Sequence, residues 1–401
     1  MKVARFDPSP FGFPKPRISP LPNRLQIKAF GDQEASDQRK KTAGQFRTFR
    51  RGRYALGEAY RLAGLNQDAT LLAPAYHCLT MLDPAINLGA NVLLYPVRAD
   101  LSPDLDNLDT IARNASRPIK ALLATHFFGI AVDFAPLKQW CTERGIVLIE
   151  DCSHALFTRG YGAAGTGIYG EYVVSSPYKF FTCKDAGLLF AQDGRILNSV
   201  KTFHPGLMEE LCAIKYVIES HRSGSASPAG IEEIGQSLTD LLQKHPEAAN
   251  VQTTQYDSYP TGSFSAANAR KSSLRSSEWL IRLSSVKDIT KRRRDNFRQW
   301  LEAVAGLANC RPLYRDLPEG CIPYMFPLYI DHPDTHFPLL KYLGVPIWRW
   351  DNLAVSSSLI ANDYRLHLIH LPCHQSLSEE QMAWMIAAVR EVMLHSVPEA
   401  D

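Results

Sequence analysis

The chain has 401 residues, of which 45% are hydrophobic and 21% are charged, and its formal net charge is +3. This composition is typical of a soluble globular protein with two or three domains, and it indicates neither a nucleic-acid-binding protein nor a membrane-surface protein. The eight cysteines form no C-x-x-C pair, which favours reduced thiols in a cytoplasmic protein over a disulfide framework or a zinc site, so we expect no bound metal. No apolar run is long enough to predict a transmembrane helix.

The first segment, residues 1–45, is rich in proline and lacks the hydrophobic core of a signal peptide, so it predicts an extended N-terminal arm. Residues 46–290 are expected to form a large α/β domain. Between about residues 54 and 190, helix-like and strand-like segments alternate, among them "RYALGEAYRLAGL", "ATLLAP", "NVLLYPV", "KALLATHFFG" and "GIVLIED". Apolar strands separated by helices predict a mainly parallel sheet that is covered by helices on both faces.

Residues 200–290 contain small polar stretches, "SGSASPAG" and "PTGSFSAANARKSS", which predict loops in a variable connecting region of the large domain. The basic run "KRRRDNFR" at 291–298 indicates a solvated helix face rather than a polynucleotide groove. From residue 291 onward, a long helix precedes strand-like and helix-like segments, and Ser378 with Gln381 predicts a capping box for the last helix. We therefore predict a smaller α+β C-terminal domain over residues 291–401.

Polar residues follow the ends of several predicted strands. They are found at 74–77, at His126, at Asp151 and at 175–179. Parallel sheets bind ligands beyond the carboxyl ends of their strands, because loops and helix N-termini converge there. A ligand site at this edge of the sheet is the expected result, although His126 is equally well explained as a core histidine.

Three features at this edge suit pyridoxal phosphate. Lys179 follows the short β-branched run "YVV" at 172–174. The alternative that Lys179 is an ordinary solvated cation is weakened by the two features described next. Asp151 ends a buried strand, where it either caps a helix or binds a cation such as a pyridinium nitrogen. Gly52 precedes a helix and is flanked by arginines, including Arg53, which together predict an anion site. A lysine that forms a Schiff base, a carboxylate for the ring nitrogen and a helix terminus for the phosphate are what this cofactor needs.

Two hydroxyl groups extend this prediction. Ser175 and Ser176 lie just before Lys179, so they are candidates for donating hydrogen bonds to the phosphate.

Several motifs also resemble a known family, the DegT/DnrJ-type nucleotide-sugar aminotransferases, which are PLP-dependent enzymes of fold type I. The similarity extends from about Arg51 to the C-terminus and is weakest in the middle region. The motifs that carry it are "RGRYAL", "PAYHC", "HFFG", "IEDCSH", "SSPYKFFTCKDAG" and "HLIHLPCHQSLSEEQM".

The resemblance implies roles for individual residues. It assigns the ring-nitrogen contact to Asp151 and a contact with the cofactor O3′ to His154. The acidic-Gly-Gly step of the family falls on residues 185–187, which selects Lys179 rather than Lys184 as the catalytic lysine. The aromatic side chain that stacks on the cofactor ring is not singled out.

Two further sets of residues come from the resemblance. Tyr76 and His77 are both candidates for the stacking side chain. Asn268 and Arg270 resemble the element by which a neighbouring subunit reaches the cofactor phosphate, and this implies a homodimer.

The function that the resemblance implies is transfer of an amino group from glutamate or glutamine to a keto-sugar, carried on a nucleotide, in polysaccharide biosynthesis. The chain departs from the family pattern where Arg51 replaces a serine and where "GVPIWRWDNL" brings in two tryptophans. Two alternatives stay open: a PLP-dependent transferase or lyase that acts on a non-sugar substrate, and a non-catalytic binding or regulatory protein with the same fold.

Overall fold

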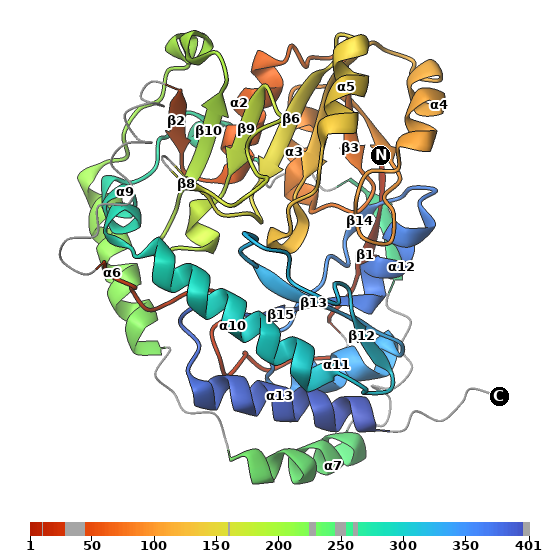
Figure 1. Cartoon of the computed structure of the whole chain (residues 1–401), viewed down its shortest axis with the longest axis vertical. Coiled ribbons are helices and arrows are strands. Elements are labelled where there is room, and N and C mark those ends of the chain that lie inside the picture. The colour runs from red at the N-terminus through yellow and green to blue at the C-terminus, as the bar shows by residue number, and fades with distance from the viewer. Residues whose placement is uncertain are drawn as a thin grey trace.

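The computed structural model describes residues 1–9, 11–28, 45–158, 161–223, 230–244, 254–259 and 264–395. A seven-stranded sheet in the order β2-β10-β9-β6-β5-β3-β4 lies in the upper half of Figure 1. The five strands from β9 to β4 are parallel, whereas β10 is antiparallel to both of its neighbours. The strands are β2 (Phe46–Phe49), β3 (Thr70–Pro74), β4 (Asn91–Tyr95), β5 (Ile119–Thr125), β6 (Val147–Cys152), β9 (Tyr172–Ser175) and β10 (Gly187–Ala191). This confirms the predicted α/β class with a mainly parallel sheet.

Helices cover both faces of this sheet because its strands are apolar on both sides. Along β3, Leu71 packs in the cluster that includes the first pair of helices, and Leu72 packs in the cluster that includes the second pair. Successive side chains of a strand point to opposite faces, so an unbroken apolar run is buried on both. The first pair is α2 (Gly52–Leu62) and α3 (Leu79–Asn87), and the second pair is α4 (Leu108–Arg113) and α5 (Ala135–Glu143).

A second core lies around a three-stranded antiparallel sheet in the order β12-β13-β15. Large side chains fill this core, among them Phe297, Trp300 and Trp384. The predicted capping box of the last helix is present, since Ser378 and Gln381 exchange side-chain to backbone hydrogen bonds of 3.2 and 3.1 Å. The elements are α10 (Val286–Val304), β12 (Cys310–Pro312), β13 (Met325–Ile330), α11 (Pro333–Leu343), α12 (Leu359–His367), β15 (Leu368–Pro372) and α13 (Glu379–Leu394).

The division into a large and a small domain remains a proposal. The boundary that we placed between residues 290 and 291 falls inside helix α10, which begins at Val286.

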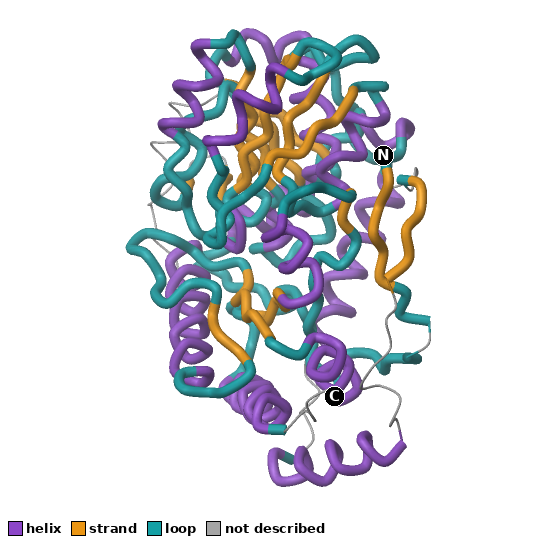
Figure 2. The backbone as a smooth tube through the Cα atoms, turned by 90° about the vertical axis from the view of Figure 1, so that its right-hand side faces the viewer, coloured by secondary structure: helices purple, strands orange, loops and turns teal. Residues whose placement is uncertain are grey.

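The N-terminal residues form a strand that joins distant parts of the chain. Strand β1 (Lys2–Phe6) pairs antiparallel with β11 (Thr254–Ser258) on one side and with β14 (Leu353–Ala354) on the other. Figure 2 shows β1 and its neighbouring strand beside the N-terminus, at the edge of the molecule. Of the predicted arm, residues 10 and 29–44 lie outside the described residues.

The predicted connecting region contains helices as well as loops. Parts of the predicted loops, residues 224–229 and 260–263, lie outside the described residues. The elements here are α6 (Leu207–Ser223), α7 (Ile234–Lys244), α8 (Ala266–Ala269) and α9 (Arg275–Leu283). The remaining short elements are η1 (Leu105–Asn107), η2 (Phe127–Gly129), β7 (Phe157–Thr158), β8 (Tyr161–Gly162), η3 (Pro177–Lys179), η4 (Gly194–Ser199) and η5 (Ile231–Glu233). Across the described part of the chain, no helix combines the length and the apolar character needed to cross a membrane.

Candidate active site

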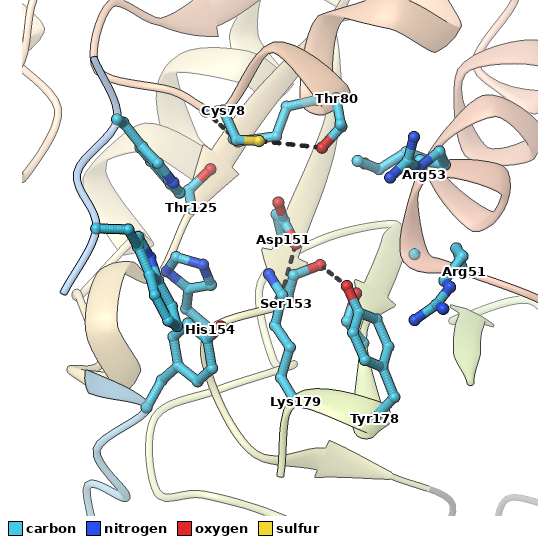
Figure 3. A pocket seen from close by; sticks show the side chains of 17 residues that line it. Arg51, Arg53, Cys78, Thr80, Thr125, Asp151, Ser153, His154, Tyr178 and Lys179 are labelled. Carbon is cyan, nitrogen blue, oxygen red and sulfur yellow. Dashed lines mark hydrogen bonds between the residues drawn. The ribbon is translucent and has the colours of Figure 1, made fainter. Parts of the chain in front are cut away.

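A cavity of about 250 Å³ lies at the carboxyl ends of β5 and β6 and beside the loop that follows β9. The sheet contributes Thr125 and Asp151, the loop contributes Lys179, and the other wall includes Trp348 and Trp350 from the C-terminal part of the chain. Figure 3 shows the side chains of Asp151 and Lys179 pointing toward one another across this space. The cavity thus occupies the edge of the sheet where the sequence predicted a ligand.

Lys179 is held in place through its backbone. It ends the short helix η3 directly after β9, and its N–H donates to the carbonyl of Ser176 at 3.0 Å. Its ammonium group lies 5.3 Å from the ring centroid of Tyr324, and the guanidinium of Arg293 donates to its carbonyl at 3.0 Å. Lys184, the other lysine of this loop, does not line the cavity.

Asp151 is a fully buried carboxylate at the end of β6. Its Oδ1 accepts a hydrogen bond of 2.8 Å from the N–H of Ser153, and no described α-helix begins between Asp151 and Lys179, so it is not a helix cap. Burial raises the pKa of Asp151, and the charge of Lys179 opposes that shift. A buried carboxylate whose pKa is raised in this way is stabilised as an anion by a cation placed against it.

The N-terminus of α2 forms one end of the cavity. Its first residue is Gly52, its N-cap is Arg51 in an extended conformation, and neither a capping side chain nor an acidic residue occupies its first turn. A Cβ at Gly52 would lie 2.2 Å from Ser176 Oγ and 3.2 Å from Ser153 Oγ, so only glycine allows both hydroxyls to approach the helix end. Backbone amides at a helix N-terminus together with hydroxyls and arginines form a site for a phosphate.

Two arginines and two serines complete this anion site. Arg51 and Arg53 line it, and the guanidinium of Arg51 lies 4.4 Å from the ring centroid of Tyr178. Ser176 Oγ donates to Ser153 Oγ at 3.1 Å (Figure 3). Ser175 does not line the cavity, because its hydroxyl points to the carbonyl of Phe157 at 2.8 Å.

Residues 185–187, which follow the lysine loop and lead into β10, contact the segment that precedes α2. A Cβ at Gly187 would lie 2.3 Å from the carbonyl of Arg51, so glycine is required where these two backbones meet. Asp185 is buried and pairs with Arg50 Nε at 2.8 Å, and its Oδ1 accepts the N–H of Leu274 at 3.2 Å. The distance in sequence between Lys179 and residues 185–187, which was used to select Lys179, therefore corresponds to contacts between the lysine loop and the residues before α2.

His154 presents a buried polar atom to the cavity. Its ring centroid lies 4.5 Å from that of Tyr324 and 5.2 Å from that of Trp350, and its Nδ1 has no hydrogen-bond partner. Burial and the nearby charge of Lys179 lower the pKa of His154 well below its ordinary value, so the ring is neutral near pH 7. Thr125 Oγ1, which also lines the cavity, is buried without a partner as well.

Tyr76 and His77 do not line the cavity. The hydroxyl of Tyr76 lies 3.1 Å from Nε2 of His370. His77 donates from Nδ1 to the carbonyl of Ala75 at 2.9 Å, and its Nε2 accepts the N–H of Ala354 at 3.2 Å. Both side chains are fully buried and satisfied in the core, and the cavity wall at this turn consists of the next residues instead: Cys78, Thr80 and Met81.

His126 belongs to the core. It donates from Nε2 to Glu150 Oε1 at 2.8 Å, and its Nδ1 accepts the N–H of Val132 at 3.0 Å. The other oxygen of Glu150 accepts the N–H groups of Tyr169 and Gly170 at 2.9 and 3.0 Å. His126 and Glu150 form, with a nearby cysteine, a group of potential metal ligands among the described residues, but protein N–H groups already occupy these donor atoms.

Asn268 and Arg270 lie away from the cavity of their own chain. Asn268 donates to Ser265 Oγ at 3.3 Å, and Arg270 is exposed at the end of α8. The neighbouring Phe264 packs against Tyr54, on a side of α2 that does not line the cavity, with ring centroids 5.4 Å apart. Asn268 and Arg270 therefore do not line the cavity of their own chain.

Residues 47–221 match the model of the DegT/DnrJ/EryC1/StrS aminotransferase family. The resemblance seen in the sequence motifs is thereby confirmed over these residues.

Curated relatives are similar over part of their length. The chain is 26% identical to GDP-perosamine synthase of Vibrio cholerae over 155 residues, which are 38% of this chain and 41% of the relative. It is 28% identical to dTDP-4-dehydro-2,3,6-trideoxy-D-glucose 4-aminotransferase of Saccharopolyspora spinosa over 190 residues, 43% of this chain and 48% of the relative. The matched region therefore spans less than half of either relative.

Solved structures are similar over nearly the whole chain. The aminotransferase TlmJ of Streptoalloteichus hindustanus superposes with a TM-score of 0.60 at 17% identity, covering 92% of both chains. NtdA of Bacillus subtilis, solved with the bound cofactor PMP, gives a TM-score of 0.60 at 14% identity, covering 93% of this chain and 79% of its own. At such low identity these similarities establish the fold.

Some residues of the cavity were missed by the sequence analysis. Ser153 lies within the quoted motif "IEDCSH", two residues after Asp151, and this position was the available signal. Tyr324, which lies about 145 residues after Lys179 in the chain, carried no signal of its own.

Proposed function

We propose that this protein is a pyridoxal phosphate-dependent aminotransferase that transfers an amino group from glutamate or glutamine to a keto-sugar carried on a nucleotide. The observation that carries the proposal is that Lys179 and Asp151 point toward one another in a cavity that ends at the N-terminus of α2 (Figure 3). When bound, pyridoxal phosphate would supply an electron sink for the electrons released as a substrate C–H bond breaks.

The residues present fit this cofactor. The glycine at position 52 leaves the space that a phosphate approaching the helix end requires, and Ser153 and Ser176 supply hydroxyls there. Asp151 would hold the proton of the ring nitrogen, because a cation placed against this buried carboxylate stabilises its anionic form. The unpartnered Nδ1 of His154 would face an oxygen substituent of the ring.

Lys179 would have two roles. Its neutral side-chain amine would hold the cofactor covalently and, once released, would act as a general base at Nζ, taking the proton from the substrate carbon and returning it. Arg293 fixes the backbone of this residue by its hydrogen bond to the Lys179 carbonyl. A lysine with a fixed backbone and a mobile side chain suits both steps.

The substrate class rests on the family match and on the relatives described above, whose names are those of nucleotide-sugar enzymes. In this chain Trp348 and Trp350 line the cavity. Indole rings bind sugar rings by stacking on their C–H faces, which agrees with a sugar acceptor.

The proposed assembly is a homodimer in the cytoplasm. Asn268 and Arg270 would extend from one copy to the cofactor phosphate of the other, because neither reaches the cavity of its own chain. A closed dimer is also the commonest form of oligomer among soluble proteins.

The experiment that tests the function compares two lysines of one loop. The Lys179→Ala variant is expected to lose the visible absorption band of the cofactor-loaded protein, and the Lys184→Ala control is expected to keep it. Adding glutamate or glutamine to the wild type should then convert the band to that of the amine form of the cofactor. A band that persists with every amino donor would favour the non-catalytic binding protein, and a band lost in the Lys184→Ala variant instead would overturn the assignment of Lys179.

A further inference from the structure

Helix α6 turns a stripe of apolar side chains toward solvent. Leu207, Leu211, Ile214 and Ile218 are 77%, 52%, 50% and 49% exposed. Their spacing of four, three and four residues places them on one side of the helix, whereas Ala213, which lies on another side, is buried. The helix is thus attached to the protein by one side and presents a coiled-coil-like seam on another.

Exposed large apolar side chains are concentrated on α6 and beside it. Of the seventeen large apolar side chains that are exposed in the described part of the chain, six lie on α6. Two more lie beside it: Phe203, which precedes the helix, and Trp279 on α9, which packs against α6. Contiguous apolar patches of this kind on a soluble protein mark an interaction surface.

The stripe is complementary to itself. If two copies of α6 lie antiparallel about a two-fold axis, Leu207 faces Ile218 of the other copy and Leu211 faces Ile214, and each pair occurs twice. In the same register Glu210 falls opposite Lys215, and no acidic side chain falls opposite another. A surface that matches its own two-fold image is what an isologous dimer contact requires.

We propose that the apolar stripe of α6 packs antiparallel against the same stripe of a second copy of this chain. This inference rests on the homodimer proposed above and identifies its contact surface. The continuity of the two elements supports it, because Phe203 donates its N–H to the carbonyl of Arg270 at 3.0 Å, so the start of α6 adjoins the segment expected to cross between copies.

Ion pairs also connect helix α6 to the residues that precede the anion site. Glu209 of α6 pairs with Arg50 at 2.5 Å, and Arg50 pairs with Asp185 at 2.8 Å. Glu210 accepts the N–H groups of Arg275 and Ser276, at 2.7 and 3.1 Å, at the start of α9. Pairing of two α6 helices therefore fixes the residues that lead into the phosphate-binding end of the cavity.

The test is the oligomeric state of the cofactor-loaded protein by light scattering. The double variant Leu211→Glu with Ile214→Glu is expected to raise the dissociation constant of the dimer at least 100-fold without unfolding the chain, since both side chains are already half exposed in one copy. The matched control is Leu359→Glu on α12, the most exposed of the large apolar side chains, which should stay dimeric. A dimeric double variant overturns the inference.

A second measurement tests the antiparallel register. In a Cys212→Ser background, Leu211→Cys with Ile214→Cys should give a cross-linked dimer on oxidation, and Leu211→Cys with Ile218→Cys should not. Failure of the first pair to cross-link overturns the register. A monomeric wild type overturns both the α6 contact and the proposed homodimer. Loss of the visible band in the Lys179→Ala variant would still support the proposed cofactor chemistry. The dimer contact and the cofactor chemistry can therefore be refuted independently.

Discussion

Replacing Arg293 with methionine is expected to destabilise the protein by about 3–5 kcal/mol and to disturb Lys179. Arg293 lies in the basic run of α10, which we had predicted to be a solvated face, but its side chain is fully buried. It donates to the carbonyls of Lys179, Pro323 and Tyr324 at 3.0 to 3.2 Å and to Gln375 Oε1 at 2.8 Å. None of these acceptors is charged.

The magnitude follows from what the substitution leaves behind. Burial lowers the pKa of Arg293 to about 10, so the guanidinium is still charged at pH 7. A hydrogen bond from a charged group contributes about 1.5–3 kcal/mol, and a buried acceptor left without a donor costs about 1–3 kcal/mol. Four acceptors are affected, but removal of the buried charge and the packing of methionine against the ring of Phe180 recover part of that loss. The net figure is therefore below the sum of the four bonds.

The assay is urea denaturation at pH 7.5, with Arg292→Met as the matched control, because Arg292 precedes Arg293 and is exposed. The control should leave the free energy of unfolding unchanged. A second readout is the pH titration of the visible band of the loaded protein, which should shift in Arg293→Met if the backbone of Lys179 moves, and should return toward the wild-type curve in Arg293→Lys. A loss of less than 1 kcal/mol, together with an unchanged titration, would refute the reasoning.

Three further predictions concern the site and the core. Asp151→Asn should lower turnover sharply and weaken cofactor binding, as measured by steady-state kinetics and cofactor titration, and near wild-type values would remove Asp151 from the mechanism. Mixing Lys179→Ala with Arg270→Ala protomers should partly restore activity if the sites are shared, whereas no recovery with subunit exchange demonstrated would place Arg270 outside the partner's site. Burial lowers the pKa of His370 to about 3 from an ordinary 6.5, so only the unfolded chain binds that proton as pH falls and stability is lost by about 1.4 kcal/mol per pH unit below 6.5. The urea midpoint should therefore drop less between pH 7 and pH 5 in His370→Gln, and an equal drop would contradict this.

The parts of the site that the sequence predicted are the parts set by local structure. Gly52, Asp151 and Lys179 each stand where a strand ends or a helix begins, and a parallel sheet brings such positions together. A side chain that reaches the cavity from far along the chain, such as Tyr324, had no local pattern that could reveal its position. Its position depends on packing between parts of the chain that are far apart in the sequence.

The turn after β3 shows why a motif does not fix the orientation of its side chains. Tyr76 and His77 were the candidates for the stacking side chain, yet both point into the core, and the next residue, Cys78, lines the cavity. The direction depends on the hydrogen bonds that His77 makes with Ala75 and Ala354, and the second of these lies far along the chain.

The basic run of α10 did contain a usable signal. Ile289, Arg293, Phe297 and Trp300 recur at helical spacing and are all buried. A single arginine within an otherwise apolar stripe indicates a buried cation that requires acceptors, whereas its neighbour Arg292 lies off the stripe and is exposed.

Strand β1 has a consequence for the order in which the chain can fold during synthesis. Lys2–Phe6 pairs with residues 254–258 and 353–354, so after this strand leaves the ribosome it has no partner until about 250 more residues have been made. At a synthesis rate of about 5–20 residues per second, the wait for residue 354 lasts roughly 20–70 seconds. During that time Val3 and Ala4, which are buried in the finished protein, are exposed on an unpaired strand. Closure of this three-stranded sheet is therefore a late event of folding, and the nascent protein is most open to chaperones and to mispairing before it occurs.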